Sequence, residues 1–173
     1  QSIREKGIAI TSDNAAAVIK SDIVILAVKP FQVTEVLNGI KKELSGDKLL
    51  ISVVTGITMN EIESIIKKNM PLFRAMPNTA IAIQESMTCI SYQQAAAADI
   101  KYVNELFKTL GKVVTIEEKL MEASTILGAC GTAYAMRYIR ASIQGGIEIG
   151  FDAVTASLIT AQTVKGAADL LLQ

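Results

Sequence analysis

Three short turns in the sequence combine backbone freedom with the small polar side chains that suit a dinucleotide. They are Ala-Val-Lys-Pro at 27–30, Thr-Gly at 55–56 and Met-Pro-Asn-Thr at 76–79, and each lies at the end of an apolar run. Dinucleotides bind at the carboxyl ends of parallel strands, largely through backbone amides. The amide of Asn78 suits a nicotinamide carboxamide, and Gly56 lets a ligand approach the backbone closely. The turns therefore predict one cofactor site if the apolar runs are neighbouring strands.

Each of these residues also has an ordinary structural explanation, which the sequence leaves open. Pro30 has the residue type that ends strands, and Asn78 and Thr79 have residue types that are common in turns. Asn14, which we predict near the ribose or adenine of the cofactor, has the residue type that caps helices. The ligand interpretation depends on the three turns lying at one edge of a sheet.

The apolar runs before the turns have the composition of parallel strands. Residues 23–27 are mostly β-branched, and we predict a central strand over 21–30 that is buried on both faces. Strand and helix patterns alternate at short spacings, which indicates an α/β fold with a Rossmann-type, doubly wound parallel sheet. We expect strands over 8–10, 21–30, 49–54, 71–76, 85–92 (at a sheet edge) and 111–116, and helices over 1–6, 15–20, 31–44 and 95–110. A further helix begins after Thr58, which forms a capping box with Glu61, and turns Ile62, Ile65 and Ile66 inward.

The pattern changes after about residue 117, where long helical periodicity with small residues replaces the strands. We therefore predict a dinucleotide-binding domain over 1–118 and an all-helical domain over 119–173. Two helices, over 132–149 and 153–172, each carry an apolar face and have no sheet to cover it. A second copy of the chain is the simplest cover, which predicts a homodimer, with a higher oligomer as the alternative.

The overall composition excludes several classes of function. Lysine plus arginine equals aspartate plus glutamate at 17 each, so we expect no nucleic-acid partner. No apolar run is long enough for a bilayer and none resembles a signal peptide, which predicts a cytoplasmic protein with no membrane partner. The chain has no histidine and two distant cysteines, so we expect no metal site and no histidine-dependent nucleophile. Its chemistry would come from a cofactor.

Taken in order, the motifs resemble one enzyme family. Ile-Leu-Ala-Val-Lys-Pro at 25–30, Arg-Ala-Met-Pro-Asn-Thr at 74–79 and Gly-x-x-Gly-x-Ala-Tyr at 128–134 are arranged as in pyrroline-5-carboxylate reductase, the last enzyme of proline biosynthesis. The resemblance covers essentially the whole chain. It implies a Rossmann domain, a helical domain that interlocks in a dimer, and an oxidoreductase that uses NADPH, or alternatively NADH. The hydride would reduce the C=N bond of a small-molecule substrate, 1-pyrroline-5-carboxylate, to give L-proline.

Matching these motifs to the family also implies the site residues. The cofactor would contact the three turns and one asparagine near the start of the chain. The substrate would meet the loop before the first long helix. The implied cofactor-binding residues are Asn14, Ala27, Val28, Lys29, Pro30, Thr55, Gly56, Met76, Pro77, Asn78 and Thr79, and the implied substrate-loop residues are Gly128, Cys130, Gly131 and Thr132.

Three departures from the family pattern set further expectations. No Gly-x-Gly-x-x-Gly turn precedes Gln1, and no Pro-Gly-Gly-x-Thr segment follows Gln173. We therefore expect a stretch that is incomplete at both ends and inactive by itself, with its catalytic residues unassigned. The loop at 128–134 also lacks the two serines and the proline that are usual in the family, which indicates a subgroup variant.

Two other functions stay open on the sequence alone. β-Hydroxyacid dehydrogenases share the two-domain plan, but the position of their catalytic lysine is occupied here by Ala135. A dimeric nucleotide-binding module without catalytic activity is the second alternative. It would bind the cofactor without consuming it.

Overall fold

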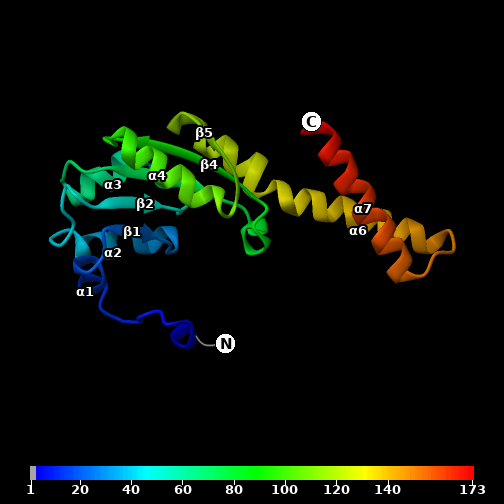
Figure 1. The fold of residues 1–173 in the computed structure, drawn as a ribbon, viewed down its shortest axis with the longest axis horizontal. Coiled ribbons are helices and arrows are strands. Elements are labelled where there is room, and N and C mark those ends of the chain that lie inside the picture. The colour runs from blue at the N-terminus through cyan, green and yellow to red at the C-terminus, as the bar shows by residue number, and fades with distance from the viewer. Residues whose placement is uncertain (1–2) are drawn as a thin grey trace. The chain divides into compact units, whose positions relative to one another are not determined.

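A computed structural model describes residues 3–173 and divides them into two compact units (Figure 1). The first unit runs to Ala129, and the second comprises Cys130–Gln173. The predicted domain boundary between residues 118 and 119 stays a prediction.

A five-stranded sheet forms the centre of the first unit, and its strands are paired in the order of the sequence. The pairs β1–β2, β2–β3 and β4–β5 are parallel, whereas β3–β4 is antiparallel. The predicted α/β fold class is confirmed, with one antiparallel pair as a difference. The link from β3 to β4 is too short for a parallel crossover, which needs a dozen or more residues. The strands are β1 (Ile23–Leu26), β2 (Leu49–Ser52), β3 (Leu72–Met76), β4 (Ser86–Gln93) and β5 (Gly111–Thr115).

Helices cover both faces of this sheet (Figure 1). Alternate residues of the strands enter two separate cores, so Leu50 packs on one face and Ile51 on the other. The first core contains α1 (Asn14–Ile19), α2 (Val33–Ile40) and α3 (Met59–Ile66), and the second contains α4 (Ala97–Lys108). Short 3₁₀ helices are η1 (Ile3–Lys6), η2 (Pro30–Gln32) and η3 (Thr79–Ile83).

Three strand predictions are wrong, and each error concerns the neighbours of a strand. Residues 8–10 form no strand, and Ile8 and Ile10 are exposed. The strand predicted over 21–30 is shorter, and β1 forms an edge of the sheet made by the described residues, with Ile25 51% exposed. Strand β4 was predicted at an edge but lies between β3 and β5. Its polar residues Ser86, Thr88 and Ser91 are buried, so its alternating polarity did not mean exposure.

The last part of the first unit is a run of short helical turns. These are η4 (Glu118–Leu120), α5 (Met121–Ser124) and the π-helical turn η5 (Thr125–Ala129). The sequence predicts helix here but not the π turn. Met121 is fully buried and fixes the middle of the run to the first unit.

The second unit is a helical hairpin of α6 (Gly131–Glu148) and α7 (Ala153–Leu171), as predicted. Gly150 has a φ of 113°, which favours glycine in the turn between the helices. A Cβ atom on Gly146 would lie 3.1 Å from the Cβ of Ala156, so the glycine allows close packing of the two helices. Within the described residues, no helix is long and apolar enough to cross a bilayer.

The N-cap of α7 predicts an acid-sensitive helix. Asp152 accepts hydrogen bonds from the amides of Val154 and Thr155, both at 3.0 Å, and the Thr155 contacts are the main reason that its pKa is lowered. A lowered pKa means that the stabilisation is complete above the unfolded value of roughly 3.9 and is lost as the pH falls below it. Asp152→Asn keeps a capping oxygen but does not titrate.

We expect the thermal midpoint of the wild type to fall relative to that of Asp152→Asn as the pH is lowered from 5 towards 2. Circular dichroism melting curves at several pH values measure this difference. Asp169→Asn, which changes a carboxylate near the other end of α7, serves as the control. Parallel pH curves for the wild type and Asp152→Asn would contradict the prediction.

Candidate cofactor site

The predicted turns lie at one edge of the sheet because their three strands run parallel. The amide of Val53 donates to the carbonyl of Leu26 at 3.0 Å, which continues the β1–β2 ladder one residue past β2. The Thr55 hydroxyl lies 3.9 Å from the Met76 sulfur and makes a weak hydrogen bond between the second and third turns. We call this edge, residues 27–30, 53–56 and 76–79, the rim.

The first turn of the rim is held in one conformation by local contacts. Lys29 has an extended backbone, and its amide donates to Oε1 of Gln32 at 3.2 Å. Pro30 occupies the first position of η2, where its missing N–H costs no hydrogen bond. Lys29 is exposed, so it brings a positive charge to the rim that suits a diphosphate.

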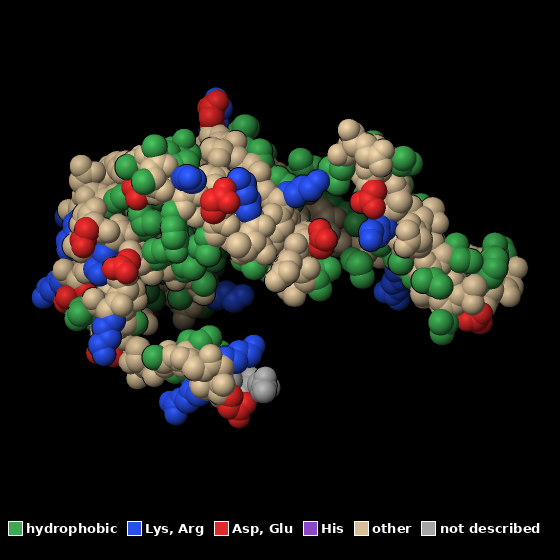
Figure 2. Space-filling model, viewed as in Figure 1, with side chains coloured by type: hydrophobic (Ala, Val, Ile, Leu, Met, Phe, Trp, Pro, Cys, Tyr) green, Lys and Arg blue, Asp and Glu red, His purple; other side chains and the backbone are tan. Residues whose placement is uncertain are grey.

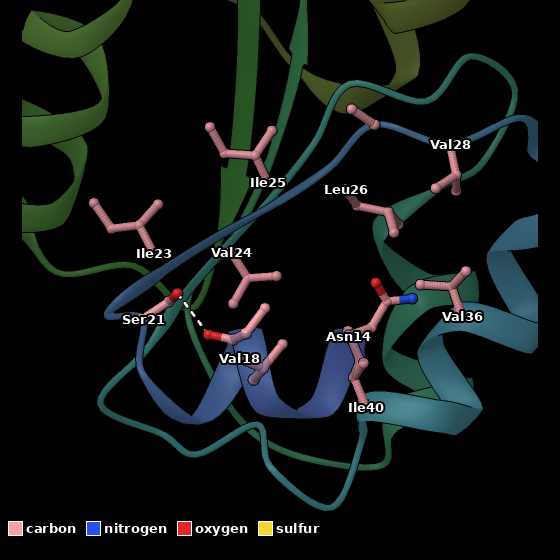
Figure 3. Close-up of a pocket in the computed structure, with 12 residues that line it drawn as sticks. Asn14, Val18, Ser21, Ile23, Val24, Ile25, Leu26, Val28, Val36 and Ile40 are labelled. Carbon is pink, nitrogen blue, oxygen red and sulfur yellow. Dashed lines mark hydrogen bonds between the residues drawn. The ribbon is translucent and has the colours of Figure 1, made fainter. Parts of the chain in front are cut away.

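A cavity of about 240 Å³ lies beside β1, between α1 and α2 (Figure 3). Asn14, Ala27 and Val28 line it, so the structure brings together three predicted cofactor-binding residues. The cap of α1 is Asp13, whose Oδ1 accepts from the amide of Ala16 at 3.0 Å. Capping therefore does not account for Asn14. Figure 3 shows the Asn14 amide between the side chains of Leu26 and Val36.

Asn78 connects the third turn to two other segments. Its Oδ1 accepts from the Ala80 amide at 3.1 Å and caps η3, so the turn explanation of this residue holds. That bond leaves Nδ2 as a donor, and Nδ2 lies 3.4 Å from the carbonyl oxygen of Gly128. The backbone amide of Asn78 donates to the Ser86 hydroxyl at 3.1 Å. Asn78 is therefore fixed on three sides and joins the rim to the first residue of the predicted substrate loop.

Four other predicted residues lie at the starts of helices. Thr79 is exposed on η3. In the second unit, Cys130 precedes α6, while Gly131 and Thr132 form its first turn. These residues stay predictions.

Sequence reasoning missed two residues that support the rim. Ser86 accepts from Asn78 and lies 3.2 Å from the Thr88 hydroxyl in a buried pair. Gly111 has a φ of 139°, and a Cβ there would overlap the backbone of Ser86. Polar residues on alternate positions of β4 and a glycine at the start of β5 were the available signals. Neither signal identifies its partner in another strand.

Gly56 offers a direct test of the rim. Its φ of 76° is a left-handed conformation, and a Cβ there would meet no atom within 4 Å. We expect Gly56→Ala to lower the free energy of unfolding by roughly 1–2 kcal/mol, the cost of that conformation for alanine.

If the cofactor approaches the backbone at Gly56, the added methyl group should also raise the Kd for NADPH, by more than the lower stability of the variant explains. Fluorescence titration, with Gly7→Ala as the positive-φ control away from the rim, measures the difference. Equal Kd values in both variants would argue against contact at Gly56.

Comparison with known proteins connects this geometry to one family. Residues 118–173 match the model for pyrroline-5-carboxylate reductase dimerisation, and residues 1–56 match the model for coenzyme F420-dependent NADP oxidoreductases. The chain is 42% identical to pyrroline-5-carboxylate reductase 2 of Dictyostelium discoideum, over 98% of this chain and 62% of that protein. It is 36% identical to the pyrroline-5-carboxylate reductase of Methanosarcina acetivorans, over 96% of this chain and 62% of the relative. Over nearly its whole length the chain is similar to pyrroline-5-carboxylate reductases.

Solved structures of the reductase family have the same fold. The structure of the Plasmodium falciparum enzyme with NADP bound matches with a TM-score of 0.89 at 31% identity, over 94% of this chain and 62% of that one. The Coxiella burnetii enzyme matches with a TM-score of 0.90 at 30% identity, over 97% and 63%. The chain spans 33% and 62% of the length of the two Dictyostelium reductases that it matches.

Proposed function

We propose that the protein containing this chain reduces 1-pyrroline-5-carboxylate to L-proline with NADPH, with NADH as the alternative donor. The observation that carries the proposal is the rim, where three turns of one reductase family lie together at the ends of parallel strands. The NADP in the related Plasmodium structure supports the choice of cofactor. This reaction is the final step of proline biosynthesis.

The residues of the rim, together with Asn14, suit a bound dinucleotide. Asn14 is directed into the cavity beside β1, where an adenosine would find an amide and apolar walls. The exposed Lys29 and the glycine at 56 suit the diphosphate, one by charge and the other by backbone access. Met76 and Asn78 would border the nicotinamide. The residues present therefore fit the cofactor.

The chemistry asks little of the protein beyond positioning. Bound NADPH supplies the hydride that reduces the imine carbon. The electron pair of the C=N π bond moves to nitrogen, and an imine that arrives protonated becomes the secondary amine without a protein acid. Asn78 and Ser86 hold the third turn in one conformation, so that the substrate and the cofactor meet in a fixed geometry.

We propose that the assembly is a homodimer formed through residues 132–149 and 153–172, with a higher oligomer as the alternative. The match to the dimerisation model supports oligomer formation. Figure 2 shows apolar side chains gathered on the helical hairpin around the α6–α7 turn. Ile149, Val154 and Leu158 are each at least 70% exposed, and a second copy would cover them. We also propose a cytoplasmic location, which fits two cysteines that form no disulfide.

The test uses the complete gene product with NADPH and 1-pyrroline-5-carboxylate. We expect loss of NADPH absorbance that requires the imine, with one proline formed for each NADPH consumed. NADPH binding without consumption would favour the non-catalytic module. Oxidation of a β-hydroxyacid with NADP and no imine reduction would favour the dehydrogenase alternative, which the alanine at position 135 already disfavours.

A further inference from the structure

Strand β3 contributes a buried charge that the cofactor site does not use. Arg74 is 3% exposed, and its Nη1 atom lies 3.0 Å from Oε1 of Glu118. Within the described part of the chain, its Nε atom has no hydrogen-bond partner. A buried guanidinium with so few partners depends strongly on the one carboxylate that it contacts. Glu118 is therefore held closely against β3.

Glu118 is held from a second side as well. The same oxygen accepts from the amide of Met59 at 2.6 Å, at the start of α3. A carboxylate at a helix N-terminus is stabilised by the free amides and the helix dipole. Glu118 thus fixes the start of η4 to both β3 and α3.

The other end of the same run is fixed to the exit of β3. Asn78, four residues after Arg74, donates to the carbonyl of Gly128 in the π-helical turn η5. π-Helical turns are rare and need support from their surroundings. Residues 118–128, which we call the bridge segment, are therefore held at both ends by side chains from one strand and its exit. Fully buried Met121 holds the middle.

We propose that Arg74 is a positioning residue: with Glu118 and Asn78 it sets the place of the bridge segment on β3, and thereby the place of Gly128 beside the rim. This inference rests on the proposed function, because Gly128 begins the predicted substrate loop. Arg74 is 3% exposed, which leaves it little surface for contact with either ligand. Its loss should therefore impair the substrate side of the site more than cofactor binding.

The test compares Arg74→Lys and Glu118→Gln with Lys119→Gln. Arg74→Lys keeps the charge but loses the planar guanidinium, and Glu118→Gln keeps an acceptor but loses the charge. Lys119→Gln removes a neighbouring exposed ion pair, Lys119 to Glu117 at 2.6 Å, and is the matched control. In the complete gene product, we expect the KM for 1-pyrroline-5-carboxylate to rise roughly tenfold or more in the first two variants. The Kd for NADPH should change less than about twofold.

A second readout does not depend on activity. Hydrogen exchange measured by mass spectrometry should become roughly tenfold faster in peptides from residues 118–129 of these variants, and stay unchanged in β2 and α4. Asn78→Ala should accelerate exchange near Gly128 and in η3, which Asn78 caps, without disturbing the buried Arg74–Glu118 pair. It therefore tests the attachment of the bridge segment even if the Arg74 variants fold poorly.

The outcomes separate the two proposals. Imine reduction that is absent from the wild type would refute the proposed function, while the exchange measurements would still test the positioning role. Exchange that accelerates throughout the first unit, or KM and Kd values that change together, would show that Arg74 supports only stability. Variants that behave like Lys119→Gln would overturn the inference.

Discussion

Replacing Gly111 by alanine should lower the free energy of unfolding by about 3 kcal/mol or more, which is a large effect for one methyl group. The glycine has a φ of 139°, and an added Cβ would overlap the backbone oxygen and nitrogen of Ser86. Because Ser86 N donates to the carbonyl of Leu110 at 3.0 Å, the backbone cannot move aside without breaking the β4–β5 pair. Urea denaturation followed by circular dichroism measures the loss.

Gly39→Ala is the matched control for this substitution. Gly39 lies in α2, and a Cβ there would meet no atom within 4 Å. Alanine in a helix should raise stability by up to about 1 kcal/mol relative to glycine. If both variants changed stability by a similar amount in the same direction, the close approach of β5 to Ser86 would be refuted.

Replacing Asn78 by alanine should lower kcat for imine reduction about a hundredfold, because a small misplacement of reacting groups has effects of this size. The side chain caps η3 with Oδ1 and holds the Gly128 carbonyl with Nδ2. Asn78→Asp separates these two roles. Aspartate keeps the capping oxygen but has no donor for Gly128, and its charge repels the carbonyl.

We therefore expect Asn78→Asp to lose as much activity as Asn78→Ala while keeping more of the wild-type stability. Steady-state kinetics and thermal melting of the complete gene product measure the two effects. Asn38→Ala, which removes a bond from Nδ2 to the carbonyl of Thr34 on α2, is the control and should be fully active. A fully active Asn78→Asp would show that only the cap matters.

The sequence was most informative where a structural signal is local. The capping box of Thr58 and Glu61 and the N-cap formed by Asp152 are signals of this kind, because each depends on residues within three positions of one another. Strands β2 and β3 are confirmed because both are fully buried and apolar enough to be recognised alone. The rim follows from these strands and their parallel pairing.

Predictions that depended on distant neighbours were less successful. The position of β1 at an edge and of β4 inside the sheet depends on which strands pair, and neither strand carries that information. In the same way, nothing near Asn78 indicates Gly128, fifty residues later, as its partner. The Arg74–Glu118 pair spans 44 residues and was also missed. Such contacts need the fold before they can be seen.

The strand order of the sheet also bears on how the chain folds. Because neighbouring strands are consecutive in the sequence, each new strand pairs with the one made just before it. Among the described residues, the core on the face of α1, α2 and α3 draws its buried residues from positions 18–72. All of these residues have been synthesised before β4 and β5. During translation the sheet can therefore grow by adding one strand at a time to a core that already exists.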